Sequence, residues 1–269
     1  MSGRFVRWCN GNTAPFGGVI HGSNPCRTAR LDRNFPLCPN GELVKHPEVR
    51  HLLQPRILNL AVIAALASAV ACYPRLSLWL NRSAPVWYLE GAIFLCGTFL
   101  WGFVFAWHTP YTHRPVFTPK LKPGLFIVAA VAAIIAAAVF DLALDPSLRA
   151  KVPEDYPFDL EHWFAFVLFS LALNQLFLIF APFAWLMRLF KRRWVAVNLT
   201  VLFGVVLLAM RIQTFPTPLL PLLVAALLTG KIAMGFLAVS FYLRGGVLLV
   251  WWWTFLFEAR HLLNLTGHA

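Results

Sequence analysis

The stretch that decides the fold lies between Gly124 and Leu144, where the chain reads GLFIVAAVAAIIAAAVFDLAL. It contains a single charged residue, Asp141, and it matches the ~20 apolar residues that a helix needs to cross a bilayer. The whole chain has the same character, since 59% of its 269 residues are hydrophobic and only 13% are charged. Typical soluble domains are about 25% charged. The composition therefore argues against a soluble enzyme or nucleic-acid-binding protein, which would have too few charged side chains to cover its surface.

Seven stretches satisfy the same length rule, which predicts an all-α, polytopic transmembrane bundle within residues 44–269. Only residues 244–246 separate the last two stretches, so we expect these to form a tight helical hairpin. The first stretch is long and is interrupted by Pro74 and Arg75, which leaves six or eight spans as alternatives. The expected spans are about 57–80, 86–107, 124–144, 162–188, 194–212, 218–243 and 247–265.

The distribution of Lys and Arg predicts the orientation of these spans. With the N-terminus inside, most basic loop residues fall on the cytoplasmic side, and the acidic stretch 145–161 falls outside. The net charge of +12 then reflects loops that face an anionic leaflet rather than a nucleic acid. The expected partners are the lipid bilayer and another membrane protein. The five Cys form no CxxC pair, so neither a zinc site nor a disulfide scaffold is indicated. No metal or cofactor is expected.

Residues 1–43 are polar and contain no apolar run long enough for a span or a signal peptide. Residues about 7–30 resemble a translated transfer-RNA gene: residues 8–11 can be written TGG-TGT-AAT-GGT, like a D-arm, and residues 22–25 GGT-TCG-AAT-CC, like a T-arm. We therefore expect translation to begin near Val44, after a purine-rich ribosome-binding sequence, in a bacterium whose cell membrane holds the protein. The alternative is a disordered cytoplasmic tail.

Polar residues within the spans are the candidate functional residues, because charged groups at membrane depth cost ~2.5–3.5 kcal/mol on insertion scales. Lys231 lies in the middle of the sixth span, and its structural alternatives are an ion pair with Asp141 or Glu258, or an extended side chain that reaches the interface. The amides at positions 174 and 175 lie centrally in the fourth span, where they can join helices by hydrogen bonds. The expected polar intramembrane cluster comprises Asn174, Gln175, Lys231, Glu258 and Arg260.

Glu258 and His261 are three residues apart and share one face of the last helix, which is compatible with an acid/base pair, with two metal ligands or with a salt-bridged helix end. His162 is expected on the same side of the membrane, so these three residues are the candidate catalytic groups. Their convergence on a wet cavity would favour an enzyme. His108 and His113 are expected on the opposite side, and their spacing matches no metal motif.

The C-terminal part, about 162–265, resembles the CPBP family, intramembrane proteases related to the type II CAAX prenyl endopeptidases. The resemblance lies in the order of its segments: Asn-Gln-Leu-Phe at 174–177, Leu-Met-Arg-Leu-Phe-Lys-Arg-Arg-Trp at 186–194, Val-Leu-Phe-Gly at 201–204 and the Tyr-Leu-Arg-Gly-Gly turn at 242–246. It covers under half of the chain.

The resemblance implies that the family's catalytic groups have been replaced in this chain. The two family glutamates correspond to Asn174 and Gln175, and Ile179 stands where the family has arginine. Leu207 and Phe255 stand where the family has histidine. Because amides do not take a proton from water at neutral pH, the family mechanism is not available here.

Three functions follow as hypotheses. The first is a non-catalytic, CPBP-like scaffold or partner-binding subunit. A deep polar cavity with a buried carboxylate next to a histidine would argue against the scaffold. The second is a membrane-embedded hydrolase or peptidase that uses Glu258 and His261. The third is a transporter of a small solute or lipid, which would predict internal repeats, and the sequence shows none.

Overall fold

The structure, a computed structural model, describes residues 52–78, 84–118, 122–153, 156–215 and 218–266. These residues are mostly helical and form no strand, which confirms the predicted all-α bundle. Six of their helices are long and apolar enough to cross a membrane. The segment that resembles a transfer-RNA gene and the expected start near Val44 lie outside the described residues.

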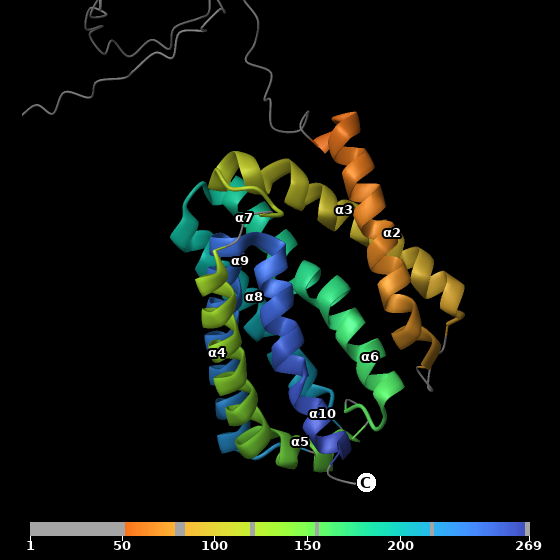
Figure 1. Cartoon of the computed structure of the whole chain (residues 1–269), viewed down its shortest axis with the longest axis vertical. Coiled ribbons are helices and arrows are strands. Elements are labelled where there is room, and N and C mark those ends of the chain that lie inside the picture. Colours follow the sequence, from red (N-terminus) through yellow and green to blue (C-terminus); the bar gives the residue numbers. More distant parts are fainter. Residues whose placement is uncertain (1–51, 79–83, 119–121, 154–155, 216–217, 267–269) are drawn as a thin grey trace, which may run out of the picture. The chain divides into compact units, whose positions relative to one another are not determined.

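The first two spans are α2 (Pro55–Leu78) and α3 (Val86–Thr112), which pack side by side (Figure 1). Trp101 of α3 donates a hydrogen bond of 3.0 Å from its indole nitrogen to the Ser68 hydroxyl of α2. The described part of α2 continues through Pro74, which was predicted to interrupt it, and α3 ends five residues beyond the predicted Trp107.

The third and fourth spans are long helices that contain π-helical turns. The third runs from Pro123 to Lys151, past its predicted end at Leu144, and the fourth runs from Leu160 to Phe190. π-Helical turns inside α-helices are frequent at functional sites. The third span consists of α4 (Pro123–Val139), η1 (Phe140–Leu144) and α5 (Asp145–Lys151), and the fourth of α6 (Leu160–Phe169), η3 (Ser170–Asn174), η4 (Leu176–Phe180) and α7 (Ala181–Phe190).

The last part of the chain consists of α8 (Arg193–Gln213), α9 (Pro221–Glu258) and α10 (Arg260–Thr266). α9 is interrupted at Gly246, whose backbone has φ +67° and ψ −159°. In a straight helix Lys231 and Glu258 would lie about 40 Å apart. Both border one cavity, so the chain folds back at Gly246 (Figure 1, blue). The two arms of α9 thus supply the sixth and seventh predicted spans. Because both of these spans belong to α9, the seven predicted spans correspond to six helices.

The reversal is held by the segment that precedes α4. The amide of Val247 donates a 3.0 Å hydrogen bond to the carbonyl oxygen of Val116, and Arg114 donates to the carbonyl oxygen of Leu243. A Cβ atom added to Gly246 would overlap the Val116 oxygen. Gly246 therefore lies where both the positive φ and the close approach of another backbone require glycine.

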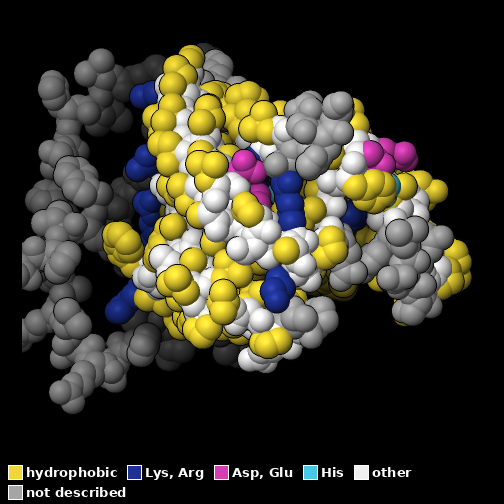
Figure 2. Space-filling model, turned by 90° about the horizontal axis from the view of Figure 1, so that it is seen from below, with side chains coloured by type: hydrophobic (Ala, Val, Ile, Leu, Met, Phe, Trp, Pro, Cys, Tyr) yellow, Lys and Arg dark blue, Asp and Glu magenta, His cyan; other side chains and the backbone are white. Residues whose placement is uncertain are grey.

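The outer surface of the spans carries large apolar side chains, as a hydrocarbon environment favours. Ile63, Phe99 and Ile134 are each about two-thirds exposed, at 65%, 67% and 64%. Figure 2 views the bundle from the end where α5 and α10 lie, and shows hydrophobic side chains spread over the surface, with the charged ones in a few small groups. This distribution is the one expected for a protein whose solvent is lipid.

Candidate functional site

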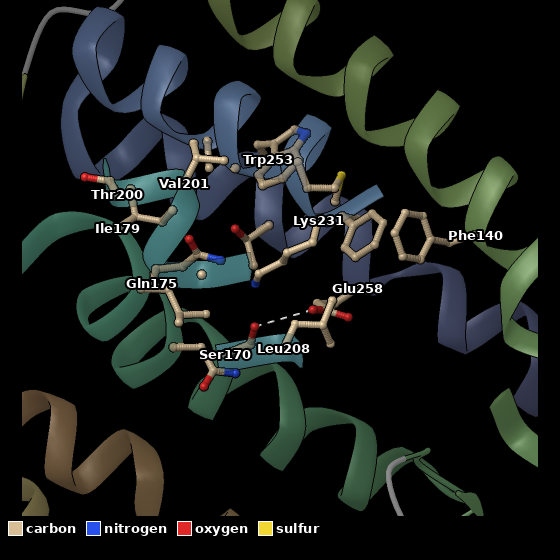
Figure 3. A pocket seen from close by; sticks show the side chains of 18 of the residues that line it. Phe140, Ser170, Gln175, Ile179, Thr200, Val201, Leu208, Lys231, Trp253 and Glu258 are labelled. Carbon is tan, nitrogen blue, oxygen red and sulfur yellow. Dashed lines mark hydrogen bonds between the residues drawn. The ribbon is translucent and has the colours of Figure 1, made fainter. Parts of the chain in front are cut away.

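A cavity of about 270 Å³ lies within the bundle, between α8, the two arms of α9 and the π-helical turns (Figure 3). All three π-helical turns contribute lining residues: Phe140 from η1, Ser170 from η3 and Ile179 from η4. Most of the remaining wall is apolar. An apolar hollow in which a small number of polar groups converge is typical of a binding site for a small molecule.

Four of the five polar residues predicted to cluster line this one cavity: Asn174, Gln175, Lys231 and Glu258. They come from the fourth span and from the two arms of α9, so their meeting depends on the reversal at Gly246. The fifth, Arg260, is joined to the cluster through Glu258.

Lys231 extends from the first arm of α9 toward Gln175 (Figure 3). Within the described residues its ammonium group makes neither an ion pair nor a hydrogen bond, so the pair with Asp141 or Glu258 that we considered is not formed. Asp141 lies 3.9 Å from Arg149 instead. Gly204 of α8 leaves room for the lysine, because a Cβ atom there would come within 3.2 Å of the Lys231 Cε.

Further polar atoms of the cavity walls also have no partner within the described residues. They are the amide oxygen of Gln175, the hydroxyl of Thr254 and the indole nitrogen of Trp253, all buried. Buried polar atoms in proteins are almost always hydrogen-bonded, because leaving one unpaired costs about 1–3 kcal/mol. Three such atoms, together with the unpaired lysine, belong to residues that line this one cavity.

Glu258, by contrast, has several partners at the end of the last span. The Arg260 guanidinium lies 3.2 Å from one of its carboxylate oxygens, and the Ser170 hydroxyl donates to the other at 3.4 Å. The His261 Nε2 lies 3.5 Å from the same oxygen that Arg260 contacts. Glu258 is thus salt-bridged to Arg260 at the end of the last span, as the interpretation of a salt-bridged helix end requires.

Arg260 also binds Asp145 of α5, with 3.0 Å between its Nε and a carboxylate oxygen. Asp145 was expected in an acidic loop outside the membrane, but it is 2% exposed and lies within the extended third span. Tyr156 donates a 3.0 Å hydrogen bond to it. Burial, followed by the Asp145 carboxylate, raises the pKa of the Tyr156 hydroxyl, so this tyrosine remains a neutral donor.

His162 does not join this group. Its ring Nδ1 and its backbone amide lie 2.8 and 2.7 Å from the same carboxylate oxygen of Asp159, the N-cap residue of α6. Neither His162 nor His261 is among the described residues that line the cavity. In the part of the chain that the structure describes, no three His, Cys, Asp or Glu side chains are placed to hold a metal ion.

Sequence reasoning did not single out Ser170, Thr254 or Asp145. Hydroxyl side chains carry little signal in an apolar span, since they can bond to the carbonyl one turn earlier. Of the other two histidines, His113 is exposed, whereas His108 is buried against Tyr242, with ring centroids 4.5 Å apart.

The fold and the cavity define a class, that of helical membrane proteins with an apolar internal cavity that holds a few polar side chains. No protein-family model, curated protein or solved structure matches this chain. The resemblance to the CPBP family therefore rests on the residues of the C-terminal part alone.

Proposed function

We propose that this chain is a non-catalytic membrane protein that binds a small amphipathic anion in the cavity around Lys231. The proposal narrows the partner-binding function expected from the sequence to a small ligand. A pure scaffold is less favoured, because Glu258 lies buried beside His261 at a polar cavity, the feature we expected to weigh against it.

The unpaired ammonium of Lys231 is the observation that carries the proposal. A cation surrounded by apolar walls attracts an anion strongly, because little water is present to screen the interaction. Thr254 and Gln175 line the same cavity and carry hydrogen-bond donors, a hydroxyl and an amide nitrogen. Glu258 does not compete for the lysine, since Arg260 pairs with it. The apolar walls then accommodate a short alkyl group.

Decanoate, which has a carboxylate and a ten-carbon chain, is a suitable probe for this site. We expect the detergent-purified full chain to bind decanoate, detected by native mass spectrometry, and to bind decylamine far less. Lys231→Met should weaken decanoate binding by about tenfold or more, the loss of one charge-assisted contact. The matched control is Lys151→Met, since Lys151 is exposed and does not line the cavity. Equal binding of decanoate by Lys231→Met and the wild type would contradict the proposal.

A hydrolase is the second candidate, because the His261 Nε2 lies 3.5 Å from a Glu258 carboxylate oxygen. Two contacts argue against it: the Arg260 guanidinium occupies that same oxygen, 3.2 Å away, and the rings of Tyr156 and Phe166 flank His261. Hydrolysis of p-nitrophenyl decanoate by the wild type that disappears in Glu258→Gln would favour the hydrolase. We expect the same background rate from both.

A further inference from the structure

A second hollow, of about 430 Å³, lies between the start of α8 and the end of the first arm of α9. Its polar lining groups are the side chains of Arg193, Arg244 and Ser240, and its aromatic ones include Trp194. The other lining residues are apolar: Val197, Phe236, Val239 and Leu243. The hollow thus joins a cationic part to an apolar floor.

The two arginines come from helices far apart in the sequence and meet at this hollow. Both are exposed, and within the described residues neither makes a hydrogen bond or an ion pair. Trp194 beside them is 78% exposed. If Arg193 and Arg244 only followed the preference of basic residues for cytoplasmic loops, nothing would require them to border the same apolar hollow.

We propose that this hollow binds an anionic phospholipid, with its phosphate between Arg193 and Arg244 and one acyl chain along the apolar floor. Guanidinium groups bind phosphate oxygens in pairs of charge-assisted hydrogen bonds. Basic pockets between transmembrane helices bind phospholipid headgroups on the cytoplasmic side, the side to which the distribution of Lys and Arg assigns this end. Trp194 has the amphipathic ring that is enriched at headgroup depth. A free phosphate ion would leave the floor unused.

The test compares phosphatidylglycerol with phosphatidylcholine of the same acyl chains on the full-length protein, by native mass spectrometry from detergent. We expect the wild type to prefer phosphatidylglycerol. The double variant Arg193→Gln/Arg244→Gln should lose about 30-fold in affinity for it, at about fivefold for each basic residue near an anionic headgroup. Arg192→Gln removes the same charge next to the hollow without lining it, and should keep the preference.

A variant that fills the hollow separates lipid binding from a general charge effect. Ser240→Trp leaves the charge unchanged, and this variant should also bind phosphatidylglycerol more weakly than the wild type does. Three results would overturn the proposal: an unchanged preference in the double variant, an equal loss in Arg192→Gln, or displacement of the lipid by inorganic phosphate alone. Decanoate binding should survive in the double variant, so this inference can fail independently of the proposed function.

Discussion

Replacing Gly246 by alanine tests the reversal on which the cavity depends. Its φ of +67° and ψ of −159° lie in a region populated almost only by glycine, where other residues are strained by about 1–3 kcal/mol. The new Cβ would also push against the Val116 oxygen, which now accepts a 3.0 Å hydrogen bond from Val247 worth about 1 kcal/mol. We therefore expect Gly246→Ala to lower the free energy of unfolding by about 2–4 kcal/mol.

The assay is reversible unfolding in mixed micelles with increasing SDS, followed by tryptophan fluorescence. Gly91→Ala is the matched control, because Gly91 lies in a helix and a Cβ atom there meets nothing within 4 Å. It should stabilise by at most about 1 kcal/mol. Gly246→Ala should also weaken decanoate binding, since the reversal returns Thr254 to the cavity that Lys231 lines. If the two variants unfolded within about 0.5 kcal/mol of each other, the reasoning from backbone geometry would be refuted.

Three more outcomes are expected from the same unfolding and binding measurements. Arg260→Met should cost about 3–5 kcal/mol, because it removes the guanidinium that neutralises the buried carboxylates of Asp145 and Glu258; a loss below about 1 kcal/mol would contradict this. Hydrogen bonds from the backbone amide and the ring of His162 lower the pKa of Asp159 in the folded state, so the contribution of Asp159 to stability should be present above about pH 4 and lost as the pH falls through that lowered pKa. Asp159→Asn should flatten the pH dependence of the unfolding midpoint, and an unchanged slope would count against this reasoning. Gly204→Ala should weaken decanoate binding by moving the lysine of the cavity, at a stability cost of about 1 kcal/mol, and unchanged binding would place the ligand elsewhere.

The spans were predictable because hydropathy and length are local properties of the sequence. The polar cluster was predictable for a related reason, since the membrane gives Lys231 and Glu258 few acceptable places other than the bundle interior. The pairing of Asp145 with Arg260 could not be predicted from the sequence, because it depends on how two helix ends that are distant in the sequence meet. Pro74 was expected to interrupt its span, but the described helix continues through it, as neighbouring helices in a membrane can compensate for a proline.

The π-helical turns have a consequence for how the fourth span meets its neighbours. Each such turn changes the helical phase, whereas an ordinary α-helix advances by about 100° per residue and keeps one stripe facing one side. Below η3 the span packs against α2 and α10, and above η4 it packs against α3 and α8. Because η3 and η4 each change the direction in which the following side chains point, a single uninterrupted span can present differently oriented faces to different neighbours. Deleting one residue of η3 after Ser170 would rotate the two halves relative to each other and turn Gln175 away from the cavity that it now lines, even though every other side chain in the span were kept.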